Sequence, residues 1–296
     1  MKFELTAYLD YLKSDLDEQL NLATKLEIRS FFLRRINGKR INDLTDQEFN
    51  SIAQQLTKQK VKVIGVDPMI DAYNLSDLEG KKHFEEELIK ATTRAKQLKA
   101  DFMYYVIPKF VDVMKDTDFI ISHIKEHLSI IKKSKLDVLL KPANGHKSNT
   151  YRYILGILKD DKVTINFDPV YFYTNKESNV TAYRILREYI SVFVANDLDK
   201  EHNPRLIGLG QLDVLEMYKK LLKNDYKGFV VLDSDLPELL DAASKIKWYH
   251  KLSGKKRLEK KILVDFIERR GQFSLYDCIH YQWVILNVIF YNKKID

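Results

Sequence analysis

The stretch KVTINFDPVYFY, residues 162–173, decides the fold of this chain. Residues 163–167 are apolar or β-branched at most positions, which predicts a buried strand, and Asp168 and a proline follow directly. Three other stretches have the same form: VLLK ends at Lys141, SVFVAND at Asn196 and Asp197, and FVVLD at Asp233. Because the carboxyl ends of parallel strands meet at one edge of a sheet, these polar residues predict a site there.

Strands and helices alternate eight times along the chain. The expected strands are 2–9, 30–34, 61–66, 102–107, 136–140, 163–167, 190–195 and 228–232. The expected helices are 16–26, 45–59, 81–99, 118–133, 149–158, 179–188, 213–223 and 237–248. Eight such units, with no glycine-rich phosphate-binding turn after the first strand, favour a closed (β/α)8 barrel over an open doubly wound sheet.

The barrel is expected to span residues 1–250, followed by a C-terminal helical extension at 251–296. Within that extension we expect one charged helix at 255–270 and another at 276–291. The second carries an apolar stripe at helical spacing: Tyr276, Ile279, Trp283, Leu286 and Phe290. This stripe is expected to pack on the barrel's outer helices or to form a homo-oligomer interface.

Composition narrows the function classes. The formal net charge is +7, but the lysines are spread over many helices, which is typical of a solvated surface rather than of a nucleic-acid footprint. Cys278 is the only cysteine, so no internal disulfide can form. The chain has neither a long apolar run nor a signal-peptide pattern, so we expect a cytoplasmic protein without a membrane partner.

Three stretches carry a resemblance to a known family. LRRINGKRINDLTDQEF, NFDPVY and FVANDLDKEHNPRLIGLGQLDVLEMYKKLLKNDYKGFVVLD resemble the second, sixth and seventh-to-eighth units of the sugar phosphate isomerase/epimerase superfamily. These are the xylose isomerase-like TIM barrels, which also include the family 2 apurinic-site (AP) endonucleases. The resemblance covers residues 2 to about 240 and implies a TIM barrel, a carbohydrate substrate and divalent cations such as manganese or zinc at the barrel mouth.

The implied metal ligands are largely replaced. The family's glutamate after strand five falls on Lys141, the histidine two residues later on Ala143, the "DPGH" histidine on Tyr171, the strand-seven histidine on Val194, and the strand-eight glutamate on Asp233. Only Asp168 is kept unchanged. A divalent cation needs several convergent ligands, and Lys141 brings a positive charge to its place. We therefore expect a degenerate metal site and no metal cofactor.

Lys141, Asp168 and Asp233 are the candidate catalytic residues. The Lys141 ammonium is interpreted as a replacement for the cation, paired with Asp168 or Asp233, as a Schiff-base or proton-transfer lysine, or as part of a structural salt bridge. Asp168 and Asp233 are interpreted as an acid/base pair or as structural partners of Lys141.

Other residues are candidates for substrate binding because they end strands or lie in loops on the same face: Arg34, Lys109, Tyr171, Asn196, Asp197 and Arg205. Asp197 is equally interpreted as ordering its own loop. His146 and His202 fall in loops on that face and are candidate bases. His123 and His127, four apart on one helix, are expected on a solvated face.

Three functions follow from these observations. The first is a carbohydrate isomerase or epimerase with a diverged site, acting on a sugar or sugar phosphate. The second is a catalytically inactive barrel that binds a ligand or partner. The third is an apurinic-site endonuclease, whose metal cluster needs the imidazoles and glutamates that are missing here.

Overall fold

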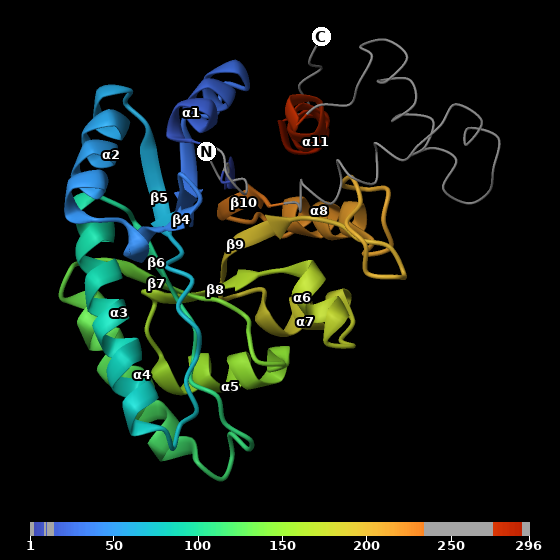
Figure 1. Ribbon diagram of the computed structural model, residues 1–296. Helices are drawn as coiled ribbons and strands as arrows, with labels where there is room; N and C mark the ends of the chain where they lie inside the picture. The colour runs from blue at the N-terminus through green and yellow to red at the C-terminus, as the bar shows by residue number, and fades with distance from the viewer. Residues whose placement is uncertain (1–2, 9, 11–14, 234–274, 292–296) are drawn as a thin grey trace.

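Eight parallel strands close into a barrel, as the sequence predicts (Figure 1). The computed structural model describes residues 3–8, 10, 15–233 and 275–291. The barrel strands are β1 (Phe3–Tyr8), β2 (Ser30–Leu33), β5 (Lys62–Val66), β6 (Phe102–Tyr105), β7 (Asp137–Leu140), β8 (Val163–Phe167), β9 (Ile190–Ala195) and β10 (Gly228–Leu232). Strand β1 closes the barrel by pairing with β10 on one side and β2 on the other, from Phe3 opposite Gly228 to Tyr8 opposite Phe32.

Helices cover the outside of this barrel. They are α1 (Leu16–Lys25), α2 (Asp46–Lys58), α3 (Leu78–Gln97), α4 (Thr117–Lys132), α5 (Ser148–Leu158), α6 (Pro169–Thr174), α7 (Asn179–Leu186), α8 (Val214–Lys223) and α11 (Leu275–Tyr291). A capping box formed by Thr45 and Glu48 begins α2. The sequence did not predict α6, nor the small hairpin of β3 (Arg35–Ile36) and β4 (Lys39–Arg40) with the 3-10 turn η1 (Ile41–Asp43) that follows it.

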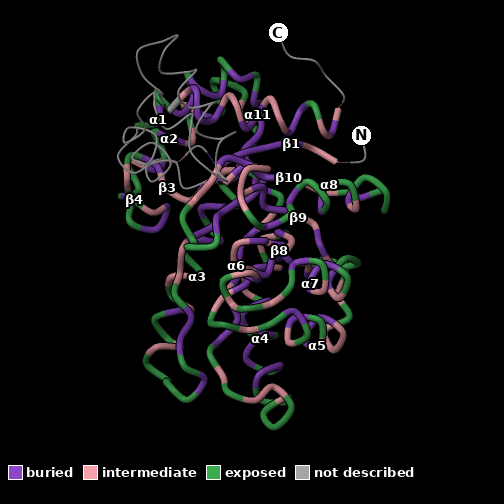
Figure 2. Tube along the Cα trace, turned by 90° about the vertical axis from the view of Figure 1, so that its right-hand side faces the viewer, coloured by how far each residue is buried: buried purple, intermediate pink, exposed green. Residues whose placement is uncertain are grey.

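Two apolar layers hold the fold together. The larger one lies between the strands and the helices, and Figure 2 shows the strands as mostly buried. The smaller one takes one side chain from each of seven strands and fills the barrel: Tyr8, Phe32, Ile64, Tyr104, Leu139, Val192 and Val231. Inward-pointing side chains normally close such a barrel, so the site can lie only at its ends.

Helix α11 packs on the barrel. Ile279, Trp283, Leu286 and Phe290 are buried, whereas Tyr276 is half-buried. The Phe290 ring contacts Phe3 of β1 at 5.0 Å and Tyr218 of α8 at 5.2 Å between centroids. The stripe is therefore buried against the barrel. The expected helices at 237–248 and 255–270, and the expected boundary near residue 250, lie outside the described residues.

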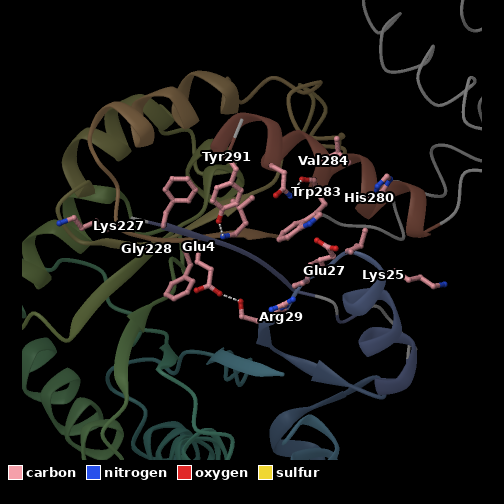
Figure 3. A pocket seen from close by; sticks show the side chains of 17 residues that line it. Glu4, Lys25, Glu27, Arg29, Lys227, Gly228, His280, Trp283, Val284 and Tyr291 are labelled. Carbon is pink, nitrogen blue, oxygen red and sulfur yellow. Dashed lines mark hydrogen bonds between the residues drawn. The ribbon is translucent and has the colours of Figure 1, made fainter. Parts of the chain in front are cut away.

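A cavity of about 1130 Å³ opens where the strands begin, at the end opposite Lys141 and Asp168. It is lined by the start of β1, by the loop from α1 to β2 and by α11, with Trp283 and Tyr291 on the α11 side (Figure 3). None of the candidate catalytic or substrate-binding residues named from the sequence lines this cavity. No helix in the described part of the chain is long and apolar enough to cross a membrane.

Candidate active site at the barrel mouth

Seven polar side chains follow the carboxyl ends of seven barrel strands. They are Asp10 after β1, Arg34 after β2, Asp67 after β5, Lys141 after β7, Asp168 after β8, Asn196 after β9 and Asp233 after β10. The inner layer of Tyr8 and Tyr104 lies beneath them and closes the barrel. Among the described residues these strand ends carry four carboxyl groups and two cations, so together they are negatively charged when all of them are ionised.

Lys141 is held by Asp67. Its Nζ atom lies 2.6 Å from Asp67 Oδ2, and Asp67 Oδ1 accepts a hydrogen bond from the Met69 amide at 2.9 Å. The Asp67 side chain is 5% exposed, whereas that of Lys141 is 35% exposed. Our expectation that Lys141 would pair with Asp168 or Asp233 was wrong, because Asp168 is held by amide donors of α6 and of Asn196, and Asp233 is held by Arg34.

Both pKa values in this pair favour the charged forms. Burial opposes the Asp67 carboxylate, but the charge and the hydrogen bond of Lys141 outweigh it and hold the pKa of Asp67 below its usual value. Burial likewise opposes the Lys141 ammonium, but Asp67 outweighs it and raises the pKa of Lys141. A Schiff-base lysine must lose its proton first, so this environment disfavours that role.

Arg34 joins two other strand ends. Its Nε lies 2.8 Å from Asp10 Oδ2, and its Nη1 and Nη2 each lie 2.9 Å from an oxygen of Asp233. The guanidinium also sits 4.1 Å above the Tyr8 ring centre. Burial of Asp10 outweighs Arg34 and raises the pKa of Asp10. Asp233 is therefore engaged by Arg34 and not by Lys141.

Asp168 begins α6. Its Oδ1 atom accepts hydrogen bonds from Val170 N at 3.0 Å, Tyr171 N at 3.3 Å and Asn196 Nδ2 at 3.0 Å. Burial raises the pKa of Asp168; the hydrogen bond from Asn196 opposes this and the Asp233 charge reinforces it. Asp168 and Asn196, both selected from the sequence, thus lie together at the mouth.

Three other candidates serve the loops around the mouth. The Tyr171 hydroxyl lies 2.7 Å from Ala143 O and 2.9 Å from His146 O, which ties the β7–α5 loop to α6. Asp197 accepts hydrogen bonds from four backbone amides, those of Leu198, Gly208, Gly210 and Leu212. Arg205 pairs with Asp199 in the same β9–α8 loop.

The remaining candidates lie on the loops themselves. Lys109 is exposed, and its backbone bridges to Asn74. The His146 ring stacks on Phe110 at 4.3 Å between centroids, and burial lowers its pKa. His202 lies beside the Tyr173 ring, and both residues line a cavity of about 410 Å³.

Asp10 and Asp67 are mouth residues that the sequence analysis missed as candidates. Asp67 directly follows a predicted strand, so the strand-end rule that selected Asp168 would also have selected it. Asp10 lies two residues beyond the last residue of β1, and its role depends on Arg34 from a different strand.

His123 and His127 do not lie on a solvated face, as the sequence analysis expected. His127 is fully buried and His123 is 6% exposed, both between α3 and α4. The four-residue spacing correctly placed both histidines on one face of α4, but that face packs against Tyr73 and Tyr105.

The mouth residues do not fit a divalent cation. No cluster of three or more histidine, cysteine, aspartate or glutamate side chains in the described ranges is placed to hold a metal ion. Asp233 is taken up by Arg34, Asp67 by Lys141, and the Lys141 ammonium would repel the ion.

The family model for xylose isomerase-like TIM barrels matches residues 21–252. The chain belongs to this family. No curated protein matches the chain. Its fold is similar to that of D-psicose 3-epimerase from Clostridium cellulolyticum H10, solved with D-tagatose (TM-score 0.64, 14% identity, 91% of this chain and 99% of that one).

Two further solved members of this fold are similar at comparable distance. The IOLI protein, solved with a bound zinc atom, has a TM-score of 0.67 at 15% identity, over 90% of this chain and 97% of that one. A xylose isomerase domain protein from Planctomyces limnophilus has a TM-score of 0.63 at 13% identity, over 85% and 97% of the two chains. At these identities the similarity establishes the xylose isomerase-like barrel and leaves the chemistry to the mouth itself.

Proposed function

We propose that the barrel mouth binds a small uncharged carbohydrate and isomerises or epimerises it without a divalent cation. The observation that carries this proposal is the Lys141–Asp67 pair, which puts a fixed ammonium where the family resemblance implies a metal ligand. Family membership and the solved epimerases supply the substrate class.

The charges at the mouth favour an uncharged ligand. Arg34 is occupied by two carboxylates and Lys141 by one, so neither cation is available for a phosphate without breaking an ion pair. A phosphate would also approach Asp168 and Asp233, whose charges repel it. A sugar hydroxyl both donates and accepts, and it can bond to a carboxylate and an ammonium that are already paired.

The chemistry would use Asp168 and Lys141. Both reactions remove a proton from the carbon next to a carbonyl, which needs a base at that carbon and a positive group at the carbonyl oxygen. A proton then returns from solvent to the opposite face of that carbon in epimerisation, or from the base to the neighbouring carbon in isomerisation. Asp168, whose pKa burial raises, supplies the base, and the Lys141 ammonium supplies the positive group from the neighbouring strand β7. Asp67 holds that ammonium in place.

One observation favours a second function, binding without turnover. Asp168 Oδ1 accepts three hydrogen bonds and begins α6, a structural role that competes with proton abstraction. A barrel with the same mouth but an inactive Asp168 would still recognise the ligand.

Solvent exchange separates the two functions. The protein is treated with a chelator and incubated in deuterated water with aldoses and ketoses and with their phosphorylated forms. Deuterium uptake at carbon is followed by NMR, and binding is measured by calorimetry. We expect uptake that Asp168→Asn abolishes with binding retained, since asparagine can still begin α6. Lys141→Met removes the positive group at the carbonyl oxygen and should slow the uptake. Lys62→Met, at an exposed ion pair with Asp101, is its matched control.

The outcomes lead to different conclusions. Binding without deuterium uptake supports the second function. Tighter binding of the phosphorylated sugars contradicts the charge argument. Failure of every sugar in the panel to bind, at concentrations up to about 10 mM, contradicts both functions.

A further inference from the structure

A buried chain of hydrogen bonds links β6 and α4 to the loop that carries Asp67. Tyr105 Oη lies 2.8 Å from His127 Nδ1, His127 Nε2 lies 3.5 Å from Tyr73 Oη, and Tyr73 Oη lies 2.9 Å from His123 Nδ1. Tyr73, Tyr105 and both histidines are at most 6% exposed. None of these groups has a role in the proposed chemistry.

One arrangement of protons satisfies this whole chain. Tyr105 donates to His127 Nδ1, His127 donates from Nε2 toward Tyr73 and Glu85, and Tyr73 donates to His123 Nδ1. Each neutral histidine then uses one nitrogen as an acceptor. A proton added to either histidine turns that acceptor into a donor, and the hydroxyl opposite it loses the partner for its own proton.

Charged side chains of α3 and α4 lie around the two histidines. Lys81 of α3 pairs with Glu126 of α4 and lies 3.7 Å from Glu85, and Glu85 lies 3.4 Å from His127 Nε2. Tyr73 and Tyr105 face the pair from the loop and from β6. Burial, followed by Lys81, lowers the pKa of both histidines, that of His127 to about 4.

Asp67 begins the loop that also carries Tyr73, six residues further along the chain. Residues 67–77 connect β5 to α3, and Asp67 at its start holds Lys141. The Tyr73 end is attached to the β6–α4 loop, because Lys109 N donates to Tyr73 O and Leu75 N donates to Lys109 O. Displacing the Tyr73 side chain therefore strains a segment whose other end positions the ammonium at the mouth.

We propose that protonation of the His123–His127 pair releases Tyr73, shifts the loop at 67–77 and weakens the Lys141–Asp67 pair, so that acid switches the mouth off. The effect on ligand binding rests on the function proposed above, whereas the effect on Asp67 does not. The two are reciprocal: a ligand that tightens the Lys141–Asp67 pair lowers the proton affinity of the histidines.

NMR of the protein without ligand tests the coupling directly. The Asp67 carboxyl carbon and the Lys141 ammonium nitrogen are observed between pH 7.5 and 4, together with the histidine rings. We expect both mouth signals to change in step with the histidine titration. In Tyr73→Phe the histidines still titrate, but the step at the mouth disappears. His83→Gln, an exposed histidine on α3, is the control and leaves the step intact.

A second variant keeps the proposal testable if Tyr73→Phe fails to fold. His123 is the last residue of the hydrogen-bond chain. His123→Gln is expected to reduce the pH-dependent change in the Asp67 NMR signal. With a sugar that binds, acidification from pH 7.5 to 4, where His127 takes up its proton, is expected to weaken affinity by about tenfold, a typical coupling between two sites. Loss of this pH dependence in Tyr73→Phe supports the proposal.

Two results overturn the coupling. One is an Asp67 signal that follows only its own titration in the unaltered protein. The other is a step at the mouth that persists unchanged in both Tyr73→Phe and His123→Gln. If the step occurs but no sugar binds, the coupling stands and the function proposed for the mouth fails.

Discussion

Lys141 Nζ lies 2.6 Å from Asp67 Oδ2, so the ammonium at the end of β7 is held by a carboxylate two strands away. The two residues belong to different β-α units of the barrel. The pair exists because closure of the sheet brings the ends of β5 and β7 to one mouth.

Removing one partner of this pair is expected to cost stability. Asp67→Asn leaves the Lys141 ammonium without its counter-charge, and we expect a loss of about 2 kcal/mol, less than for a fully buried pair because Lys141 reaches solvent. Urea unfolding measures the loss. Lys141→Met combined with Asp67→Asn should recover part of it, and Lys62→Met should stay within about 0.5 kcal/mol. A loss in Asp67→Asn as small as in Lys62→Met would contradict this.

The mouth is expected to reject divalent cations. At an effective dielectric constant of about 20, two like unit charges about 4 Å apart repel by roughly 4 kcal/mol, and a divalent ion doubles that. Calorimetry with manganese and zinc should show dissociation constants weaker than about 1 mM. Lys141→Glu should tighten binding by about tenfold, whereas Lys109→Glu on the exposed loop should not. Stoichiometric binding by the unaltered protein, lost in Asp168→Ala, would show that the mouth is a metal site after all.

His127 is expected to make the fold sensitive to acid. Burial lowers its pKa in the folded state to about 4, below the value of about 6.5 in an unfolded chain. Its contribution to stability is complete above about pH 6.5 and is lost as pH falls toward 4, because the unfolded chain binds the proton more readily. Urea unfolding at pH 7 and 4.5 should show a smaller loss in His127→Leu than in the unaltered protein. Equal losses in the two proteins would assign the acid sensitivity to other groups.

Asp197 is expected to be a structural residue. A Cβ atom at Gly210 would lie 2.1 Å from Asp197 Oδ1 and 2.5 Å from Leu198 O. Gly210→Ala should therefore displace the carboxylate from its four amides and cost about 2 kcal/mol. Gly145→Ala, whose Cβ would meet only Asn175 Oδ1 at 3.6 Å but whose φ is +73°, should cost about 1 kcal/mol. Urea unfolding of the two glycine variants measures both losses of stability. An Asp197→Asn variant with full stability but no ligand binding would instead show that Asp197 contacts the substrate.

Helix α11 is expected to contribute to stability through its buried stripe. Leu286 is fully buried, so Leu286→Ala should cost about 3 kcal/mol. Val288 on the same helix is 44% exposed, and Val288→Ala should change stability by less than about 0.5 kcal/mol. Thermal unfolding compares the two variants. If both behave alike, the packing of α11 on β1 and α8 contributes little.

The barrel could be predicted from the sequence because each strand is marked by a short run of apolar and β-branched residues. The stretch at 163–167 begins and ends in the structure as predicted, and most other boundaries shift by one to three residues. Asp168 and Asn196 were likewise placed together correctly, since both end neighbouring strands.

The pairing of charges at the mouth could not be predicted in the same way. Strand order says which residues reach the mouth, but the choice between Asp67, Asp168 and Asp233 as the partner of Lys141 depends on distances of a few ångströms. Asp168 has hydrogen bonds from α6, a helix that the sequence did not reveal, and Asp233 has Arg34. The burial of His127 was missed for a related reason. Helical spacing shows which residues share a face of the helix, but it does not show which other elements pack against that face.

Closure of the barrel has a consequence for how the chain folds during synthesis. Strand β1 has its longest pairing with β10, from Phe3 opposite Gly228 to Ala7 opposite Leu232, and the first strand must wait for the last to leave the ribosome. Contacts this distant in sequence slow folding, and the unpaired edge of β1 stays open to wrong partners until then. Arg34 meets Asp233 only after that event. The mouth therefore forms only after β10 has emerged, and the Arg34–Asp233 ion pair would report on that event.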